Sequence, residues 1–184
     1  RGGDTTNHIV GVLDERFGAS DIGDYRIQPT DIVNFAATNM REAVAPNVGG
    51  TLRVASFNVL NFFNGDGLGG GFPTSRGANT QLEYNRQIDK TVSAIIGLNA
   101  DVIGLIEIEN DGFDANSAIQ SLVNAVNAVA GAGTYAIVDP GLPMVGSDAI
   151  TVGMIYKPGA VTPKGAVAIL DSNFIDPDGV GGFD

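Results

Sequence analysis

Residues 101–109 read Asp-Val-Ile-Gly-Leu-Ile-Glu-Ile-Glu, an almost continuous apolar run. Such a run is typical of a β-strand that is covered on both faces. A second β-rich run, Leu-Arg-Val-Ala-Ser-Phe-Asn-Val-Leu, occupies residues 52–60. A glycine-rich loop over residues 64–79 and a segment with helical spacing separate the two runs. The order strand, helix, strand predicts a parallel crossover unit.

The helix of this unit is marked at both ends. Thr80-Gln-Leu-Glu83 has the spacing of a capping box, and Gly97 or Asn99 is expected to end the helix. A second helix is predicted around residues 119–126, ending at Gly131. Further strands are expected over 134–138, 149–156 and 167–170. The predicted fold class is α/β, with a mixed β-sheet and flanking helices.

The first 48 residues differ in character from the rest of the chain. They contain two short strand-like runs, Val10–Val12 and Tyr25–Ile27, and one helical possibility over residues 31–41. Pro46 and Gly49-Gly50 then form a linker-like stretch. The pattern predicts the tail of one module and a connector over residues 1–48, and a second domain over residues 49–184.

Composition narrows the possible chemistry. The chain has 184 residues, 43% of them hydrophobic, which excludes a disordered tail. Its net charge of −11 leaves no general basic surface for nucleic acid, so a protein of this kind that handles phosphate esters needs a divalent cation. The absence of Cys and the single His, His8, exclude thiolate and His-pair zinc motifs. The apolar runs are too short to cross a bilayer, so no membrane association is expected.

Glu107 and Asn58 are the first candidates for a site. Glu107 lies within an apolar strand, where a carboxylate is costly to bury unless it is paired or binds a metal. Glu109 shares its face by simple alternation. Asn58 ends the upstream strand, and both strand ends are expected at one edge of the sheet, where α/β sites form. The alternatives are a strand that emerges into water at Glu107 and an Asn that satisfies a turn at residue 58.

Other candidates lie in loops. Residues 65–76 either cradle a phosphate through backbone amides, with Arg76 adding charge, or form a surface loop; a Lys-Ser/Thr ending typical of ATP or GTP sites is lacking. Asp148 is either a turn residue or an acid that orients a base. Asp176-Pro-Asp178-Gly179 hints at a calcium turn but lacks EF-hand spacing.

These residues together resemble the endonuclease/exonuclease/phosphatase superfamily, which includes DNase I and exonuclease III. Residues 52–61 resemble its opening motif, and residues 101–110 resemble its second motif. Runs at 75–80, 86–87, 108–112, 133–136 and 146–150 are similar to those of the large bacterial extracellular nucleases. The resemblance covers about residues 49–168. Residues 10–30 resemble the end of the OB-like domain that often precedes the catalytic domain in those nucleases.

The resemblance implies a DNase I-like four-layer sandwich and an extracellular hydrolase that cleaves phosphodiester bonds of nucleic acid, with DNA favoured over RNA. Glu107 would bind the catalytic Mg²⁺, with Ca²⁺ or Mn²⁺ as alternatives. Asn58 would orient the metal surroundings and the phosphate. Glu109 would lie next to Glu107 without binding the metal itself. Arg76 would contact a substrate phosphate, and Asp148 would help to position a catalytic His.

Two departures from the family pattern matter. Ile106 replaces the Gln that usually precedes the metal-binding Glu, and the family's later motifs, which supply His and Asp residues, have no counterpart. The resemblance therefore implies the N-terminal half of a catalytic domain that is inactive without its C-terminal half. The alternatives are a phosphomonoesterase or lipid phosphodiesterase of the same superfamily, and a non-catalytic binding fragment.

Overall fold

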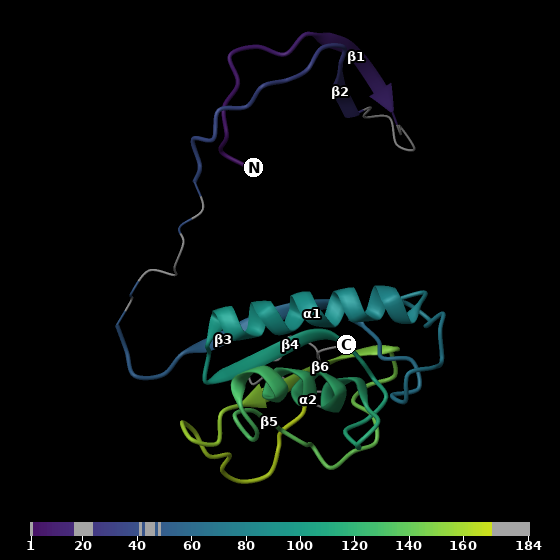
Figure 1. The fold of residues 1–184 in the computed structure, drawn as a ribbon, viewed down its shortest axis with the longest axis vertical. Helices are drawn as coiled ribbons and strands as arrows, with labels where there is room; N and C mark the ends of the chain where they lie inside the picture. The colour runs from purple at the N-terminus through teal and green to yellow at the C-terminus, as the bar shows by residue number, and fades with distance from the viewer. Residues whose placement is uncertain (1, 17–23, 41, 43–46, 48, 171–184) are drawn as a thin grey trace, which may run out of the picture. The chain divides into compact units, whose positions relative to one another are not determined.

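The computed structural model describes residues 2–16, 24–40, 42, 47 and 49–170 (Figure 1). The chain divides into two compact units, residues 1–49 and residues 50–184. The possible calcium turn at residues 176–179 lies outside the described residues.

The first unit contains an antiparallel pair of strands, β1 (Gly11–Arg16) and β2 (Asp24–Pro29). The helix predicted over residues 31–41 is wrong through residue 40, because Ala36 instead forms a bridge with Thr5. The side chains of Thr38 and Asn39 donate hydrogen bonds to backbone carbonyls of residues 2–3, an alternative to helical bonding that these residue types favour. An OB-like origin for this unit remains a prediction.

The second unit contains a mixed four-stranded sheet in the order β3-β4-β6-β5. Its strands are β3 (Val54–Phe62), β4 (Val102–Glu109), β5 (Ala136–Ile137) and β6 (Ile150–Tyr156). β3 and β4 are parallel, which confirms the predicted crossover, and the other neighbours are antiparallel. The strand expected at 134–138 is reduced to two residues, and none forms at 167–170.

Two helices, α1 (Gln81–Leu98) and α2 (Ala118–Ala130), pack together on one face of this sheet (Figure 1). The first half of the predicted capping box is present at α1, where the Thr80 hydroxyl accepts from the Glu83 amide at 3.2 Å. The Glu83 carboxylate reaches back one residue further than expected and accepts from the Asn79 amide at 2.7 Å. Asn99 ends α1 in a left-handed conformation, and Gly131 ends α2, as predicted.

Among the described residues, the buried core lies on one side of the sheet. Ile103 and Leu105 of β4 are fully buried beneath the helices, whereas Ile106 is 39% exposed on the opposite face. Val152 and Met154 of β6 are exposed at 62% and 44% beside a depression of about 360 Å³. The prediction that β4 is covered on both faces is therefore wrong for the described part of the chain.

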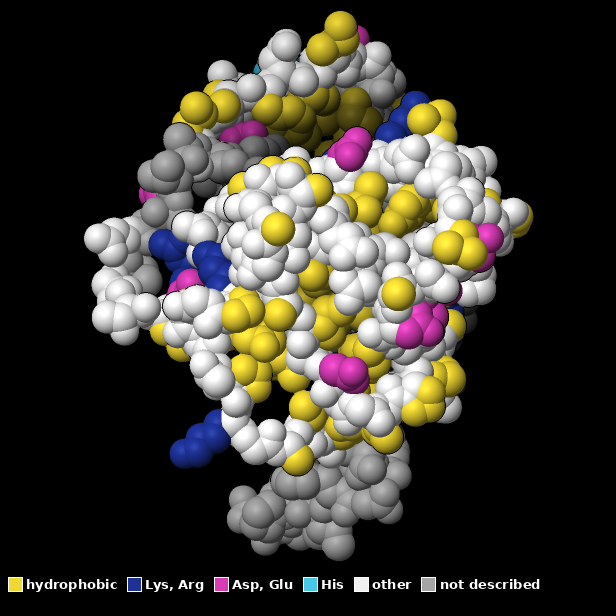
Figure 2. Space-filling model, turned by 60° about the horizontal axis from the view of Figure 1, so that its bottom comes forward, with side chains coloured by type: hydrophobic (Ala, Val, Ile, Leu, Met, Phe, Trp, Pro, Cys, Tyr) yellow, Lys and Arg dark blue, Asp and Glu magenta, His cyan; other side chains and the backbone are white. Residues whose placement is uncertain are grey.

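Apolar side chains also reach the surface over the middle of the face drawn in Figure 2. None of the helices in the described ranges combines the length and the apolar character needed to cross a bilayer.

One-sided burial predicts unequal costs for truncation of apolar side chains on the two faces of the sheet. Leu105→Ala is expected to lower the free energy of unfolding by about 3 kcal/mol, because it opens a cavity in the core. Val152→Ala is expected to cost less than about 1 kcal/mol, because that side chain already contacts water. Urea denaturation of both variants checks this, and equal losses would contradict a core on one side only.

Candidate functional site

Glu107 lies at an irregularity of the central strand. Ile106 and Ile108 pair with the adjacent residues Val152 and Thr151 of β6, so Glu107 has no partner there. Its φ is 63°, in the left-handed region that non-glycine residues rarely adopt. A bulge of this kind redirects a side chain, and such strain is frequently found at functional sites.

The neighbouring strand is irregular at the same level. Asn58 pairs with Ile106 and Phe62 pairs with Ile108, so β3 carries extra residues opposite Glu107. Leu60 and Asn61 also have positive φ values, 59° and 44°. The two irregularities face each other where the parallel strands β3 and β4 end.

Each carboxylate oxygen of Glu107 accepts one hydrogen bond from β3. The Asn58 side-chain nitrogen donates to Oε1 at 2.7 Å, and the Asn61 backbone amide donates to Oε2 at 3.1 Å. The side chain remains partly exposed, and each oxygen retains further acceptor capacity. Glu107 is therefore held in one orientation while it can still bind a cation.

The expected proximity of Asn58 and Glu107 is confirmed, but Asn58 makes contacts that the sequence did not predict. Its amide oxygen accepts from the Leu60 amide at 2.8 Å, while its nitrogen donates to Glu107. Rotation of the amide by 180° would place its oxygen against the carboxylate, so the hydrogen bonds determine its orientation. In this conformation Asn58 orients the carboxylate, and direct ligation of a metal by Asn58 remains a prediction.

Gln87 of α1 binds the irregular part of β3. Its side-chain nitrogen donates to the carbonyl oxygens of Val59 and Leu60 at 3.0 and 2.6 Å. These residues lie between the last regular pairs of β3 and β4, so Gln87 supplies hydrogen bonds within the irregularity. The sequence did not predict Gln87 as a site residue, although the run 86–87 is among those that carry the family resemblance. An amide beside the apolar face that contains Tyr84 and Ile88 was a further available signal.

Glu109 has a different environment from Glu107. Its carboxylate accepts from the backbone amide of Asn64 at 3.1 Å, and the regular alternation that would align it with Glu107 is broken by the bulge. Burial raises the pKa of the Glu109 carboxyl from 4.5 to about 7; the hydrogen bond from Asn64 opposes this rise, and the charge of Asp111 adds to it. Glu109 therefore titrates near neutral pH.

Arg76 and Asp148, which the sequence placed in separate roles, form an ion pair with each other. Two guanidinium nitrogens lie 2.7 and 3.3 Å from the Asp148 carboxylate oxygens. The backbone amide of Ala149 and then Arg76 lower the pKa of Asp148. The buried side chain of Asn110 donates to the Asp148 carbonyl at 2.9 Å and so fixes the loop. Within the described part of the chain, neither member of the ion pair bonds to Glu107.

The glycine-rich loop closes on itself. The Asp66 carboxylate accepts from the amides of Leu68 and Gly70, both at 2.8 Å. A Cβ added at Gly67 would lie 2.1 Å from the Asn116 carbonyl oxygen, so the loop also packs tightly against the segment before α2. Because these amides are occupied, the geometry favours the surface-loop interpretation over a phosphate cradle.

The donor set around Glu107 fits a weakly bound Mg²⁺ better than a closed metal cage. Among the described ranges, no group of three or more His, Cys, Asp or Glu side chains is arranged to hold a metal. Mg²⁺ commonly retains several waters and uses one or two carboxylates together with substrate phosphates. The available carboxylate of Glu107 meets that requirement. His8, the single histidine, belongs to the other unit.

Gln87→Leu is expected to lower the free energy of unfolding by about 1–2 kcal/mol, because two backbone carbonyls lose their donor. Gln120→Leu is the matched control, since the Gln120 nitrogen bonds to an exposed side chain, Asn124 on the same helix, and not to the backbone of any described residue. That change is expected to cost less than about 0.5 kcal/mol. Chemical denaturation checks both values, and similar losses would contradict the role assigned to Gln87.

The raised pKa of Glu109 predicts a loss of stability as pH rises. Below pH 4.5 the carboxyl is protonated in both states, whereas above about pH 7 the native state holds a charge that it disfavours. Glu109→Gln should therefore stabilise the protein at pH 8 by about 1.5 kcal/mol, after allowance for screening by water, and have little effect at pH 4. Denaturation at the two pH values measures the difference; a pH-independent effect would refute it.

Comparisons of the chain with protein-family models, curated proteins and solved structures find no match. The function of the Glu107 site must therefore be inferred from its own residues and their geometry.

Proposed function

We propose that residues 50–170 carry the metal-binding part of the active site of a nuclease of the endonuclease/exonuclease/phosphatase superfamily. The reaction is divalent-metal-dependent hydrolysis of phosphodiester bonds in nucleic acid, with DNA as the favoured substrate. The observation that carries this proposal is the orientation of Glu107 by Asn58 and Asn61 at two facing strand irregularities.

The hydrogen bond between Asn58 and Glu107 is a second line of support for the proposal, separate from the argument based on amino-acid composition. The two residues are 49 positions apart and belong to the two motifs on which the resemblance rests, and they form a hydrogen bond of 2.7 Å. The Glu107 carboxylate is also partly exposed, so a hydrated cation can reach it. The carboxyl ends of neighbouring strands are also where α/β folds commonly place their sites.

Each residue has a definite task in this mechanism. Mg²⁺, or Ca²⁺ or Mn²⁺ in its place, would be held by Glu107 and would offset negative charge on the scissile phosphate. Asn58 and the Asn61 amide keep the carboxylate from rotating, and Gln87 holds the backbone that carries these donors. Because the net charge is −11, the cation also offsets repulsion between the chain and a polyanion.

The sheet face opposite α1 and α2 supports the further proposal that the complete domain is a four-layer sandwich. Exposed apolar side chains on β4 and β6, including Ile106 and Val152, form a surface suited to a second sheet. In the proposed complete domain, a C-terminal half supplies that sheet together with the His–Asp couple that activates water. The extracellular location belongs to the same proposal and rests on the resemblance alone.

Metal binding tests the site directly. Titration of the chain with Mn²⁺, followed by electron paramagnetic resonance, is expected to show one weak site that Glu107→Gln abolishes. Asn58→Ala should weaken it about tenfold, because the carboxylate loses its orienting donor. Asp89→Asn, which removes an equal charge from an exposed position on α1, should leave the affinity unchanged. Equal losses in Glu107→Gln and Asp89→Asn would refute the proposed ligand.

Plasmid nicking tests the reaction. The 184-residue chain is expected to be inactive with Mg²⁺, and a form extended past Asp184 is expected to nick DNA in a manner that requires Glu107. Hydrolysis of a small phosphomonoester or a phospholipid headgroup, without nicking, would favour the other enzymes of the superfamily. Intact folding without any of these activities in the extended form would favour a binding fragment.

A further inference from the structure

A depression of about 510 Å³ lies beside the strand irregularity that holds Glu107. Its lining includes Asn61 of β3, Arg76 of the preceding loop, and Arg86, Gln87 and Lys90 of α1. Asn61 and Gln87 are the same residues that orient Glu107 and hold its neighbouring backbone. The depression therefore adjoins the proposed catalytic site through shared residues.

Positive charge is concentrated in this depression. The chain has ten Lys and Arg residues and a net charge of −11, yet three of those ten side chains line this one depression. Arg86 and Lys90 are four residues apart on α1, so they project from the same side of the helix. Like charges at that spacing repel each other unless an anion lies between them.

Two acids in or beside the lining of the depression already have partners. The Glu83 carboxylate, which also lines the depression, accepts from the Asn79 amide in the helix cap, and Asp148 pairs with Arg76. Arg86 and Lys90 are exposed, and neither forms an ion pair with any residue in the described ranges. Within the part of the chain that the structure describes, Arg86 and Lys90 are therefore available to bind an anion from solution.

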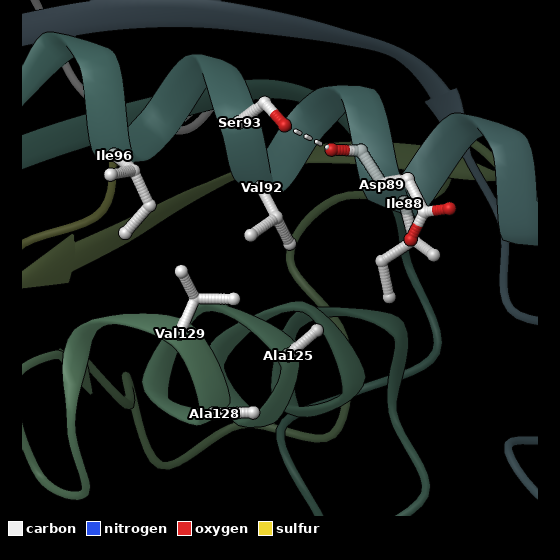
Figure 3. Close-up of a pocket in the computed structure, with 8 residues that line it drawn as sticks. All are labelled: Ile88, Asp89, Val92, Ser93, Ile96, Ala125, Ala128 and Val129. Atoms are coloured by element: carbon white, nitrogen blue, oxygen red, sulfur yellow. Dashed lines mark hydrogen bonds between the residues drawn. The ribbon is translucent and has the colours of Figure 1, made fainter.

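A larger groove between α1 and α2 does not share this character (Figure 3). It measures about 610 Å³ and is lined mainly by apolar side chains such as Val92 and Val129. The charged side chain in its lining, Asp89, is acidic. An anion is therefore expected in the depression beside Asn61 and not in the groove between the helices.

We infer that the depression binds a backbone phosphate of a nucleic-acid strand, with Arg86 and Lys90 as its main contacts. A guanidinium can bind two phosphate oxygens at once, and the Lys ammonium adds a point charge. Because Leu60 and Asn61 line the depression and the Asn61 amide contacts Glu107, a strand bound at both places would pass over these two residues. The identity of the strand rests on the proposed function, whereas phosphate binding at Arg86 and Lys90 does not require the metal.

A nuclear magnetic resonance titration in EDTA and low salt tests this inference. A single-stranded DNA trinucleotide is expected to shift the amide resonances of Asn61, Gly77 and Ala78. Inorganic phosphate should shift them less, and an uncharged nucleoside should not shift them. Arg86→Gln and Lys90→Gln should each weaken trinucleotide binding several-fold and reduce the logarithmic salt dependence by about 0.7.

Lys164→Gln is the matched control, because it removes one exposed positive charge outside the depression. It should leave binding unchanged, and the spectra also show whether each variant is folded. Equal weakening by Lys164→Gln, resonance shifts that map elsewhere, or no binding at low salt would overturn the inference. Inorganic phosphate binding as tightly as the trinucleotide would overturn the assignment to a nucleic-acid strand. Because EDTA is present, failure of the Glu107 metal site would not alter this outcome.

Discussion

The hydrogen bond between the Asn58 side chain and the Glu107 carboxylate, 2.7 Å long, is the constraint on which the site depends. Two strands must end at the same level and both must depart from regular pairing for this contact to form. Leu60, Asn61 and Glu107 accept left-handed backbone conformations in the process. These left-handed conformations cost free energy, which hydrogen bonds that involve Asn58, Asn61 and Gln87 offset.

Local signals predicted the elements that position the site. The capping residues Thr80 and Glu83 and the apolar period of the following segment determine α1 over a short range of sequence, so they can be recognised without tertiary information. The apolar run at 102–109 likewise predicts β4. The predicted helix over 31–41 failed because the bridge between Thr5 and Ala36 is a contact distant in sequence.

The details of the site could not be predicted in the same way. A positive φ at Glu107 depends on the pairing of β4 with both neighbours, and no local residue pattern reports it. The pairing of Arg76 with Asp148 joins residues 72 positions apart. Regular alternation along β4 would place Glu109 on the same face as Glu107, but the bulge at Glu107 interrupts that alternation. Residue identity thus indicated Asn58 and Glu107, while their hydrogen-bond partners required the structure.

The crossover unit formed by β3, α1 and β4 has a consequence for the order of folding. Asn58, Asn61, Gln87 and Glu107 all lie within residues 54–109, one contiguous piece of chain. Pairing of β3 with β4 closes the single connection that contains α1. Closing one such connection is kinetically favourable compared with pairing strands that lie further apart in the sequence. The donors that orient the Glu107 carboxylate can therefore come together before β6 is synthesised, and pairing of β6 with β4 then completes the bulge at Glu107.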